Sequence, residues 1–470
     1  MSTTSQVEYE AGDIAWIITS TALVLLMVPG AGLFYAGLGR RKSALSLFFL
    51  PIAAACIVFF QWFLWGYSLA FSHSASAFIG DFANVGFRNV LDGPSVASAR
   101  IPDLVFAVYQ GQFAALTAAL AIGAVAERGR PAPALLFVFV WTTLVYDPIA
   151  CWTWNPAGWV FKLGGLDFAG GTPVHIASGS AALAYSFMLG KRRGHGTFEL
   201  NFRPQNTILV ILGTLFLWVG WFGFNAGSAL SAGMRSAMAA VVTNLAAAVG
   251  GITWCAMDYR LEGKFSAIGL CSGVVAGLVV ITPGSGYVPP WSALIYGVLA
   301  GVVCNYATKI KLWIGVDDAL DIFAIHGVGG LLGDLLTGLF AADYIAALGG
   351  TTIPGGFVNH HYVQLAIQLA DGVTGGVYSF VVSCAILFVI SYIPSMHLRA
   401  SDADEVLGMD EIGHGEFAYD YCEIDRDVAN SVEETIAMRQ DRMRYSQSEV
   451  RFDADDISLQ QYAVRPGTKE

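Results

Sequence analysis

The sequence contains few charged residues. Asp, Glu, Lys and Arg make up 13% of its 470 residues, whereas a soluble globular chain carries about a quarter. Hydrophobic residues account for 55% of the chain, and the mean hydropathy is +0.57. Because so few polar side chains cannot cover a water-facing surface, the composition excludes an ordinary soluble protein and predicts an integral membrane protein.

Other chemical signals are also missing. A nucleic-acid binder needs a basic face, and the only dense basic cluster is the short loop Lys191-Arg192-Arg193. The seven cysteines show no CxxC spacing, and six lie in apolar stretches, which indicates reduced packing residues rather than disulfides or metal ligands. No HExxH, phosphate-loop or dinucleotide motif occurs. The sequence therefore predicts no cofactor, no metal and no nucleic-acid partner.

Long apolar runs, by contrast, are abundant. A helix needs about 20 mostly apolar residues to cross the roughly 30 Å hydrocarbon core of a bilayer. Eleven segments meet this requirement, and the sequence predicts an all-α membrane protein with eleven transmembrane helices. Their approximate limits are 13–38, 44–72, 101–127, 132–158, 172–190, 205–228, 235–258, 266–283, 290–309, 320–342 and 362–394.

Lys and Arg are concentrated in alternate loops. The loops after segments one, three, five, seven and nine, together with Arg399 after the last segment, hold 14 basic residues, and the opposite side holds 4. Because positively charged loops stay in the cytoplasm, we expect the N-terminus outside and the C-terminus inside. Residues 1–12 are then an extracellular N-terminus, and 13–400 form the membrane domain.

The end of the chain carries all of the net charge. Residues 1–400 hold 18 basic and 18 acidic residues, whereas residues 401–470 hold 7 and 18, a balance of −11. The segment 401–470 is predicted to be an acidic cytoplasmic tail. Its stretch 408–419 mixes aromatics, Gly and carboxylates and is expected to be ordered, whereas the remainder is expected to be flexible.

A weak internal repeat places two histidines at matching positions. Asp167 is followed by His175 eight residues later, and Asp318 by His326 at the same distance, five segments further on. An odd offset inverts one copy relative to the other, as in many transporters. A polar side chain at membrane depth is costly and usually functional. Two facing imidazoles could relay protons along a conduit, or they could be a hydrogen-bonded pair that only packs the core.

Aromatic residues gather near the outer ends of three segments, at 109–113, 152–154 and 221–225, with Ser228 one turn further on. One interpretation is the aromatic belt that marks a membrane interface. The other is a cation-collecting vestibule beside the acid Asp167, because aromatic faces attract cations. Asp167 has two possible roles as well, since an Asp before a helix can also cap its free N–H groups.

Several acids lie in or next to the spans, and five of them stand out. Three of them precede the tenth segment, where capping of the helix is the expected role: Asp317, Asp318 and Asp321. The other two, Asp147 in segment four and Asp371 in segment eleven, have no role that the sequence explains.

Longer motifs resemble a known family. The stretches VPGAGLFYAGL, YQGQFAA, LDFAGGTPVHIASG, WVGWFGFNAGSA, GLVVITPGSGYV and HGVGGLLGDLLTGLFAA occur in this order. Over roughly residues 13–420 the chain resembles the Amt/Mep/Rh ammonium transporters, and it is most similar to the fungal Mep-type permeases. The resemblance implies an inverted five-plus-five helix repeat, a homotrimer with one conduit per subunit, and a plasma-membrane location.

The resemblance also implies roles for the outer residues. Trp154, Phe113 and Ser228 match the family's external cation site, and Asp167 matches the acid near it. Phe113 and Phe224 match the stacked aromatic gate beneath that site.

His175 and His326 match the family's paired pore histidines. Some fungal paralogues carry Glu at the first position. Because this chain keeps His175, it is similar to the branch that couples ammonium uptake to nutrient sensing.

Part of the tail resembles the family's regulatory segment, which packs under the neighbouring subunit. The matching residues are Gly408, Asp410, His414, Glu416 and Tyr419. Ser446 and Ser448 follow arginines in a pattern typical of a basophilic kinase site. Short Arg/Ser patterns also arise by chance in flexible tails, so phosphorylation by a kinase is one of two interpretations.

The predicted function is transport of ammonium and methylammonium. K⁺ has nearly the size of NH4⁺ but cannot release a proton, so a dry, histidine-lined conduit rejects it through its dehydration cost. NH3 and H⁺ would pass the conduit separately. Alternatives are a receptor with little flux, or a passive NH3 channel. An intramembrane enzyme is not expected, because no Ser or Cys nucleophile accompanies the histidines.

Overall fold

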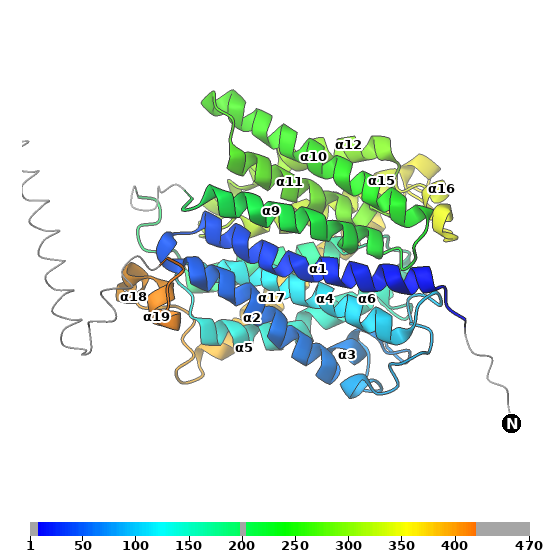
Figure 1. Cartoon of the computed structure of the whole chain (residues 1–470), viewed down its shortest axis with the longest axis horizontal. Helices are drawn as coiled ribbons and strands as arrows, with labels where there is room; N and C mark the ends of the chain where they lie inside the picture. Colours follow the sequence, from blue (N-terminus) through cyan, green and yellow to red (C-terminus); the bar gives the residue numbers. More distant parts are fainter. Residues whose placement is uncertain (1–7, 198–203, 420–470) are drawn as a thin grey trace, which may run out of the picture. The chain divides into compact units, whose positions relative to one another are not determined.

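The computed structural model describes residues 8–197 and 204–419. The chain divides into a large unit, Met1–Ala418, and a second unit, Tyr419–Glu470. Of the second unit only Tyr419 is described. Figure 1 shows the long helices of the large unit side by side in one bundle, with the short helices α18 (Asp402–Leu407) and α19 (Met409–His414) at one end of it.

Ten helical stretches among the described residues are long and apolar enough to cross a membrane. They begin and end within a few residues of the predicted segments. Their bounds are Ala11–Leu38 (α1), Arg41–Phe71 (including α2 and α3), Asp103–Val125 (α4 and η4), Pro131–Leu163 (α5 to α7), Thr207–Ala226 (α9 and η8), Met234–Glu262 (α10), Ala267–Gly284 (α11 and η9), Pro290–Ile314 (α12 to α14), Phe323–Phe340 (η11 and α15) and Gln364–Ser391 (α17).

The predicted fifth segment also forms a helix but is not one of these ten. It consists of η6 (Gly171–Ile176) followed directly by α8 (Ala177–Leu189). Its first turns contain Thr172, Pro173 and His175, which lower its hydropathy. All six residues of η6 are buried, so this helix is enclosed by its neighbours rather than covered by lipid. The number of eleven spans stays a prediction.

Glycines allow the helices to approach closely. A Cβ atom on Gly250 of α10 would lie 2.5 Å from the carbonyl oxygen of Gly273 on α11. Only a glycine fits at such a contact. Close packing through small residues is the usual way in which membrane helices associate, because lipid supplies no hydrophobic force between them.

Several spans contain a π-helical turn, which has one residue more than an α-helical turn. Three of these turns hold predicted site residues: η6 contains His175, η8 (Phe222–Ala226) contains Phe224, and η11 (Phe323–Val328) contains His326. π-helical turns are rare and often occur at functional sites. Each of these three site residues therefore lies in a π-helical turn, as do three stretches without predicted site residues, Trp62–Gly66, Thr142–Tyr146 and Ala300–Cys304.

Helices α18 and α19 are joined to the start of α2 (Ala44–Gln61). The carboxylate of Asp410 in α19 accepts hydrogen bonds from the backbone N–H groups of Leu45 and Ser46, at 3.0 and 2.8 Å. The Ser43 hydroxyl, which precedes α2, accepts from the N–H of Met409 instead of capping its own helix. Asp410 thus satisfies N–H groups that the first turn of a helix leaves unpaired.

Candidate functional site

A pair of stacked phenyl rings forms one end of the site's row of aromatic side chains. Phe113 of α4 (Asp103–Ala121) and Phe224 of η8 lie with ring centroids 4.2 Å apart and planes 12° apart. Both are fully buried. One turn before Phe113, the Tyr109 hydroxyl donates to the carbonyl oxygens of Gly223 and Phe224 and so holds η8 against α4. The predicted gate residues are in direct contact, and the stacked rings fill the space between their two helices.

Trp154 and Ser228, the other residues of the predicted cation site, lie next to the stacked rings. The ring of Trp154 meets Phe113 edge to face, with centroids 6.0 Å apart. The Ser228 hydroxyl donates to the carbonyl oxygen of Phe224 and lies 3.5 Å from the Tyr109 hydroxyl. Trp154, Phe113 and Ser228 are thus brought to one place, next to the gate.

Asp167 has a capping role in this structure. Its carboxylate accepts hydrogen bonds of 2.7–2.8 Å from the backbone N–H groups of Gly170, Gly171 and Thr172, at the start of η6. Its own carbonyl oxygen accepts from the Trp154 indole at 3.0 Å. Asp167 therefore fixes both the start of η6, which carries His175, and the orientation of Trp154.

Beneath the gate, the two histidines face each other. The Nδ1 atoms of His175 and His326 are 3.2 Å apart, and their rings are stacked 30° from parallel with centroids 5.2 Å apart. One Nδ1 must donate and the other accept. The indole of Trp221 also stacks on His175, with ring centroids 5.4 Å apart and planes 22° apart. Both histidines are buried: His175 is fully enclosed, and His326 is 5% exposed.

A small apolar cavity lies next to His326 and Trp221. Its volume is about 20 Å³, which is room for one water-sized molecule. Apart from the imidazole of His326 and the hydroxyl of Tyr35, its walls are hydrocarbon and indole. The lining residues are Ala31, Phe34, Tyr35, Leu120, Leu217, Trp221, Val275, Leu320, Ile322, Ile325 and His326.

The acid cluster before η11 only partly follows the capping prediction. Asp318 accepts a hydrogen bond from the backbone N–H of Phe323 and so caps η11, as Asp167 caps η6. Asp321 instead forms an ion pair with Lys311 at 2.7 Å. Asp317 binds Arg192, so the capping prediction is wrong for Asp317 and Asp321. Burial raises the pKa of Asp321 to about 6, and Lys311 opposes this shift.

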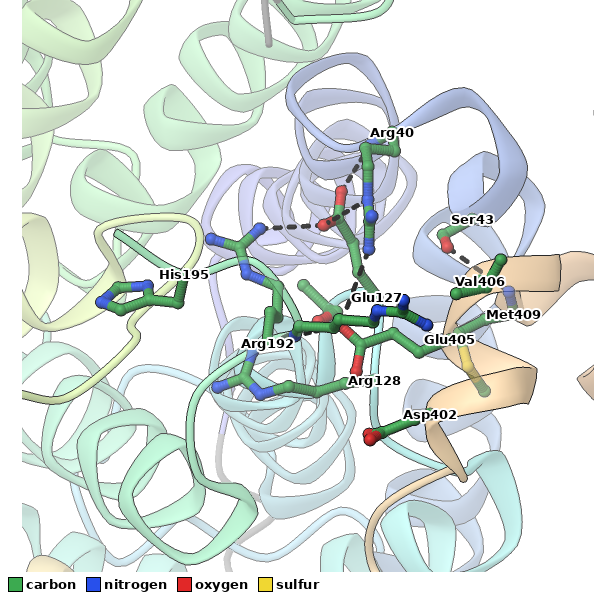
Figure 2. A network of polar contacts seen from close by, with 12 residues as sticks. Arg40, Ser43, Glu127, Arg128, Arg192, His195, Asp402, Glu405, Val406 and Met409 are labelled. Carbon is green, nitrogen blue, oxygen red and sulfur yellow. Dashed lines mark hydrogen bonds and ion pairs between the residues drawn. The ribbon is translucent and has the colours of Figure 1, made fainter. Parts of the chain in front are cut away.

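Asp317 belongs to a network of buried charges near α18, part of which is drawn in Figure 2. The Arg192 guanidinium donates to both oxygens of Asp317, at 2.8 and 2.9 Å, and to Glu127 at 2.8 Å. Glu127 also accepts from Arg40. Arg128 is fully buried and donates to the carbonyl oxygen of Asp317. The network joins the segments that follow α1, η4, α8 and α14.

The network shifts the ionisation of its members. Burial raises the pKa of Asp317, but the hydrogen bonds and charges of Arg192 and Arg128 outweigh burial and bring that pKa below its usual range. Burial lowers the pKa of Arg128 to about 10, although Asp317 opposes the shift. The paired carboxylate and guanidinium groups therefore both stay charged at neutral pH.

Some of the predicted tail residues contact the segment around the start of α2, and others are exposed. Gly408 has a φ of +110°, and a Cβ there would lie 2.5 Å from the carbonyl oxygen of Lys42. His414 lies 3.0 Å from the Ser46 hydroxyl. Glu416 is exposed. Tyr419 belongs to the second unit, and Ser446 and Ser448 lie outside the described residues.

The two acids for which the sequence predicts no role, Asp147 and Asp371, differ in their surroundings. Asp147 accepts a hydrogen bond from the Gln61 amide at 2.8 Å. Asp371 of α17 is buried, and the Thr172 hydroxyl is the hydrogen-bonding group near it, but no hydrogen bond to either oxygen of Asp371 forms in the described part of the chain. The Thr172 hydroxyl donates to Asp334 of α15 instead, at 2.9 Å. The role of Asp371 stays unexplained.

Sequence reasoning missed two important residues. The sequence indicates only that Trp221 belongs to an aromatic cluster, whereas its ring stacks on His175 and its Nε1 donates to the Thr282 hydroxyl. Glu405 was not singled out, although its carboxylate is buried and binds Arg399 and the backbone of Arg193. A signal for Glu405 was available in the sequence, because it precedes Gly408 and Asp410 of the tail motif.

Within residues 8–197 and 204–419, no group of three or more His, Cys, Asp or Glu side chains is placed to hold a metal ion. The site consists instead of aromatic rings, two imidazoles and an apolar cavity, in contact from Trp154 to His326.

These features define a multi-pass membrane transporter, and the chain belongs to the Ammonium Transporter Family, whose model matches residues 15–419. It is 59% identical over 415 residues to ammonium transporter 1 of Schizosaccharomyces pombe, covering 88% of this chain and 83% of that protein. It is 47% identical over 428 residues to ammonium transporter MEP2 of Saccharomyces cerevisiae, covering 89% and 86%. The crystal structure of Candida albicans Mep2 superposes with a TM-score of 0.82 at 46% identity, covering 92% of this chain and 95% of that one.

The matches confirm two predictions. The resemblance to the fungal Mep-type proteins is correct. The family is one of transporters, so the prediction that the chain is not an enzyme is also correct. The all-α membrane fold is shared with the Mep2 structures.

Proposed function

We propose that the chain moves ammonium, and with it methylammonium, across the plasma membrane. Membership of the Ammonium Transporter Family supports this assignment. The observation that carries the mechanism is the unbroken series of contacts from Phe113 through Phe224 and His175 to His326. Phe224 stacks on Phe113 at 4.2 Å, His175 lies 6.0 Å from Phe224, and the two imidazoles are in hydrogen-bond contact.

The first step is collection of the cation. NH4⁺ would bind between the indole face of Trp154 and the Ser228 hydroxyl, where cation–π attraction and one hydrogen bond replace part of its hydration. Asp167 lies close by and is held by three backbone N–H groups. Its negative charge would favour a cation at this point without touching it.

The second step is passage of the gate and loss of a proton. The phenyl rings of Phe113 and Phe224 are in van der Waals contact, so one ring must rotate to admit the substrate. Beyond the rings, burial makes an ion costly. NH4⁺ avoids the cost by releasing H⁺, whereas K⁺ cannot. This difference gives selectivity between two ions of nearly equal size.

The third step separates NH3 from its proton. NH3 would cross the apolar stretch beside His326, where the cavity walls offer hydrocarbon and few polar groups. The proton would move through the hydrogen bond between the Nδ1 atoms of His175 and His326. Trp221 holds His175 in the orientation that this bond requires. The net result is movement of one positive charge per ammonium.

The membrane arrangement follows from the same residues. We propose that Gly171–Leu189 is the eleventh span, and that η6 and η11 are equivalent parts of an inverted five-plus-five repeat. Capping of each by the Asp of the matching Asp-x7-His pair supports this equivalence. The distribution of basic loops places the N-terminus outside and the tail in the cytoplasm. A homotrimer with one conduit per subunit completes the proposal.

The test is ammonium-evoked current in proteoliposomes that contain the purified chain. We expect wild type to carry current with NH4⁺ and not with K⁺, and His175→Ala/His326→Ala to lose this current or its selectivity. His360→Ala, which changes an exposed loop histidine, is the matched control and should behave as wild type. Unchanged current and selectivity in the double variant would falsify the mechanism. Ammonia flux without current would instead favour a passive NH3 channel.

Nutrient sensing is proposed as a second output. The contact that favours it is the bond between Asp410 and the start of α2, because it connects the tail region to a membrane span. The same double variant separates the roles. If ammonium still triggers the growth response when the folded variant carries no flux, the chain acts as a receptor. If both are lost, signalling depends on transport.

A further inference from the structure

A basic cavity lies beside α18, away from the histidine pair. Its volume is about 150 Å³, and it is lined by Arg40, Lys42, Arg193, Glu405 and Val406. These residues come from three separate segments: the turn after α1, the loop after α8, and α18 itself. Figure 2 labels three of these lining residues, Arg40, Glu405 and Val406, next to the charge network of Glu127 and Arg192.

The single acid of the cavity is already paired. Glu405 accepts hydrogen bonds from the backbone N–H of Arg193 at 2.8 Å and from the guanidinium of Arg399 at 2.9 Å. Its oxygen lies 3.9 Å from Nη2 of Arg40, which is too far for a hydrogen bond. Glu405 is thus one negative charge shared between Arg399 and the three basic side chains that line the cavity, and it offsets only part of their charge.

The basic side chains keep donors available. Arg40 uses its Nε and backbone N–H on Glu127, whereas its buried Nη2 has no hydrogen-bond acceptor among the described residues. The guanidinium of the exposed Arg193 forms no hydrogen bond or ion pair with the described part of the chain. Lys42 donates to the carbonyl oxygen of Val406 and has two further N–H groups.

We propose that this cavity binds a phosphate group. Phosphate presents several charged acceptor oxygens, and Arg and Lys side chains from different directions are its usual partners. A cavity of roughly 150 Å³ holds a benzene-sized molecule, and a phosphate group is smaller. The group could come from free phosphate or from a phosphorylated lipid headgroup at this membrane face. In either case it would fasten α18 to the loops after α1 and α8.

Calorimetric titration of the full chain in nanodiscs of zwitterionic lipid tests the proposal. The two probes are inorganic phosphate and a water-soluble, short-chain phosphatidylinositol phosphate. We expect saturable binding of at least one probe, and at least tenfold weaker binding in Arg193→Gln and in Lys42→Gln. The matched control is Lys191→Gln, which removes an exposed charge two residues from Arg193 and should leave binding unchanged.

Each result has a defined meaning. Binding of both probes, or of phosphate alone, assigns free phosphate as a sufficient ligand. Binding of the lipid alone assigns a headgroup. Failure of both probes to bind saturably overturns the proposal, and so does an equal loss in Lys191→Gln and Arg193→Gln, because that indicates diffuse attraction. An unchanged unfolding temperature of Arg193→Gln shows that weaker binding is not a folding defect.

Discussion

At the level of single residues, Asp371 and Asp147 are both buried carboxyl groups. Asp147 accepts a hydrogen bond from the Gln61 amide, whereas the Thr172 hydroxyl near Asp371 donates to Asp334 instead. A buried polar group without a partner costs about 1–3 kcal/mol of stability. We therefore predict that Asp371→Leu raises the free energy of unfolding by about that amount, whereas Asp147→Leu lowers it by leaving the Gln61 amide unpaired.

Thermal unfolding of the purified variants in one detergent measures this difference. A fall in unfolding temperature for Asp371→Leu would mean that the carboxyl group stabilises the fold through a partner, such as a bound ion or water. Transport measured on the same samples shows whether the group also has a functional role.

Residue by residue, the sequence named more members of the candidate site than of its surroundings. His175 and His326 stand out because a histidine within a span is rare, and Phe113, Trp154 and Phe224 are recognised from long motifs. The stacking of Trp221 on His175 could not be predicted, because a tryptophan in an apolar segment is most often a core or interface residue.

At the level of elements, hydropathy predicted the spans to within a few residues, because length and apolar content alone define them. Hydropathy does not distinguish a π-helical from an α-helical turn, so η6, η8 and η11 were not foreseen. The structure of the loops differs most from what the sequence predicts. Charged residues in loops are usually solvated, yet Glu127, Arg128 and Asp317 are buried together.

The loop network leads to a prediction about pH. The pKa of Asp317 in the folded chain lies below its usual value, which is about 3.9 in an unfolded chain. Its stabilising effect is therefore complete above about pH 4 and is lost as the pH falls through the lower, folded-state value. We predict that Asp317→Asn lowers the free energy of unfolding by up to about 3 kcal/mol at pH 7, and that the difference from wild type shrinks below pH 4.

Unfolding temperatures between pH 3 and pH 7 check this prediction. Asp402→Asn is the control, because the side chain of Asp402 is 78% exposed and its ion pair with Arg399 is long, at 3.7 Å. An exposed pair of this kind contributes little at any pH. A difference between Asp317→Asn and wild type that stays constant over the whole range would contradict the assignment.

At the level of the whole molecule, the division into two units predicts what truncation will do. A chain that ends at Ala418 keeps the large unit complete, whereas a chain that ends at Leu407 loses Asp410 and with it the cap of α2. We predict that the first truncation unfolds at the wild-type temperature. The second should be less stable by about 1–2 kcal/mol or more, the cost of a lost helix cap.

Asp410→Ala in the full chain should reproduce much of the loss, and Glu416→Ala, which changes an exposed carboxylate nearby, should not. If the chain that ends at Ala418 is as unstable as the shorter one, then residues beyond 418 contribute to the fold. Stability of both truncations equal to wild type would show that the Asp410 cap is dispensable.

The π-helical turn at Phe222–Ala226 also has a genetic consequence. Each residue of a helix turns the chain by about 100°, so loss of a single codon there would rewind the segment into an α-helix and swing Ser228 away from Tyr109 and Phe113. In-frame indels of one residue should therefore be tolerated in surface loops but not in this turn. A deletion scan across 222–226 would trace, codon by codon, how closely the outer site depends on that extra residue.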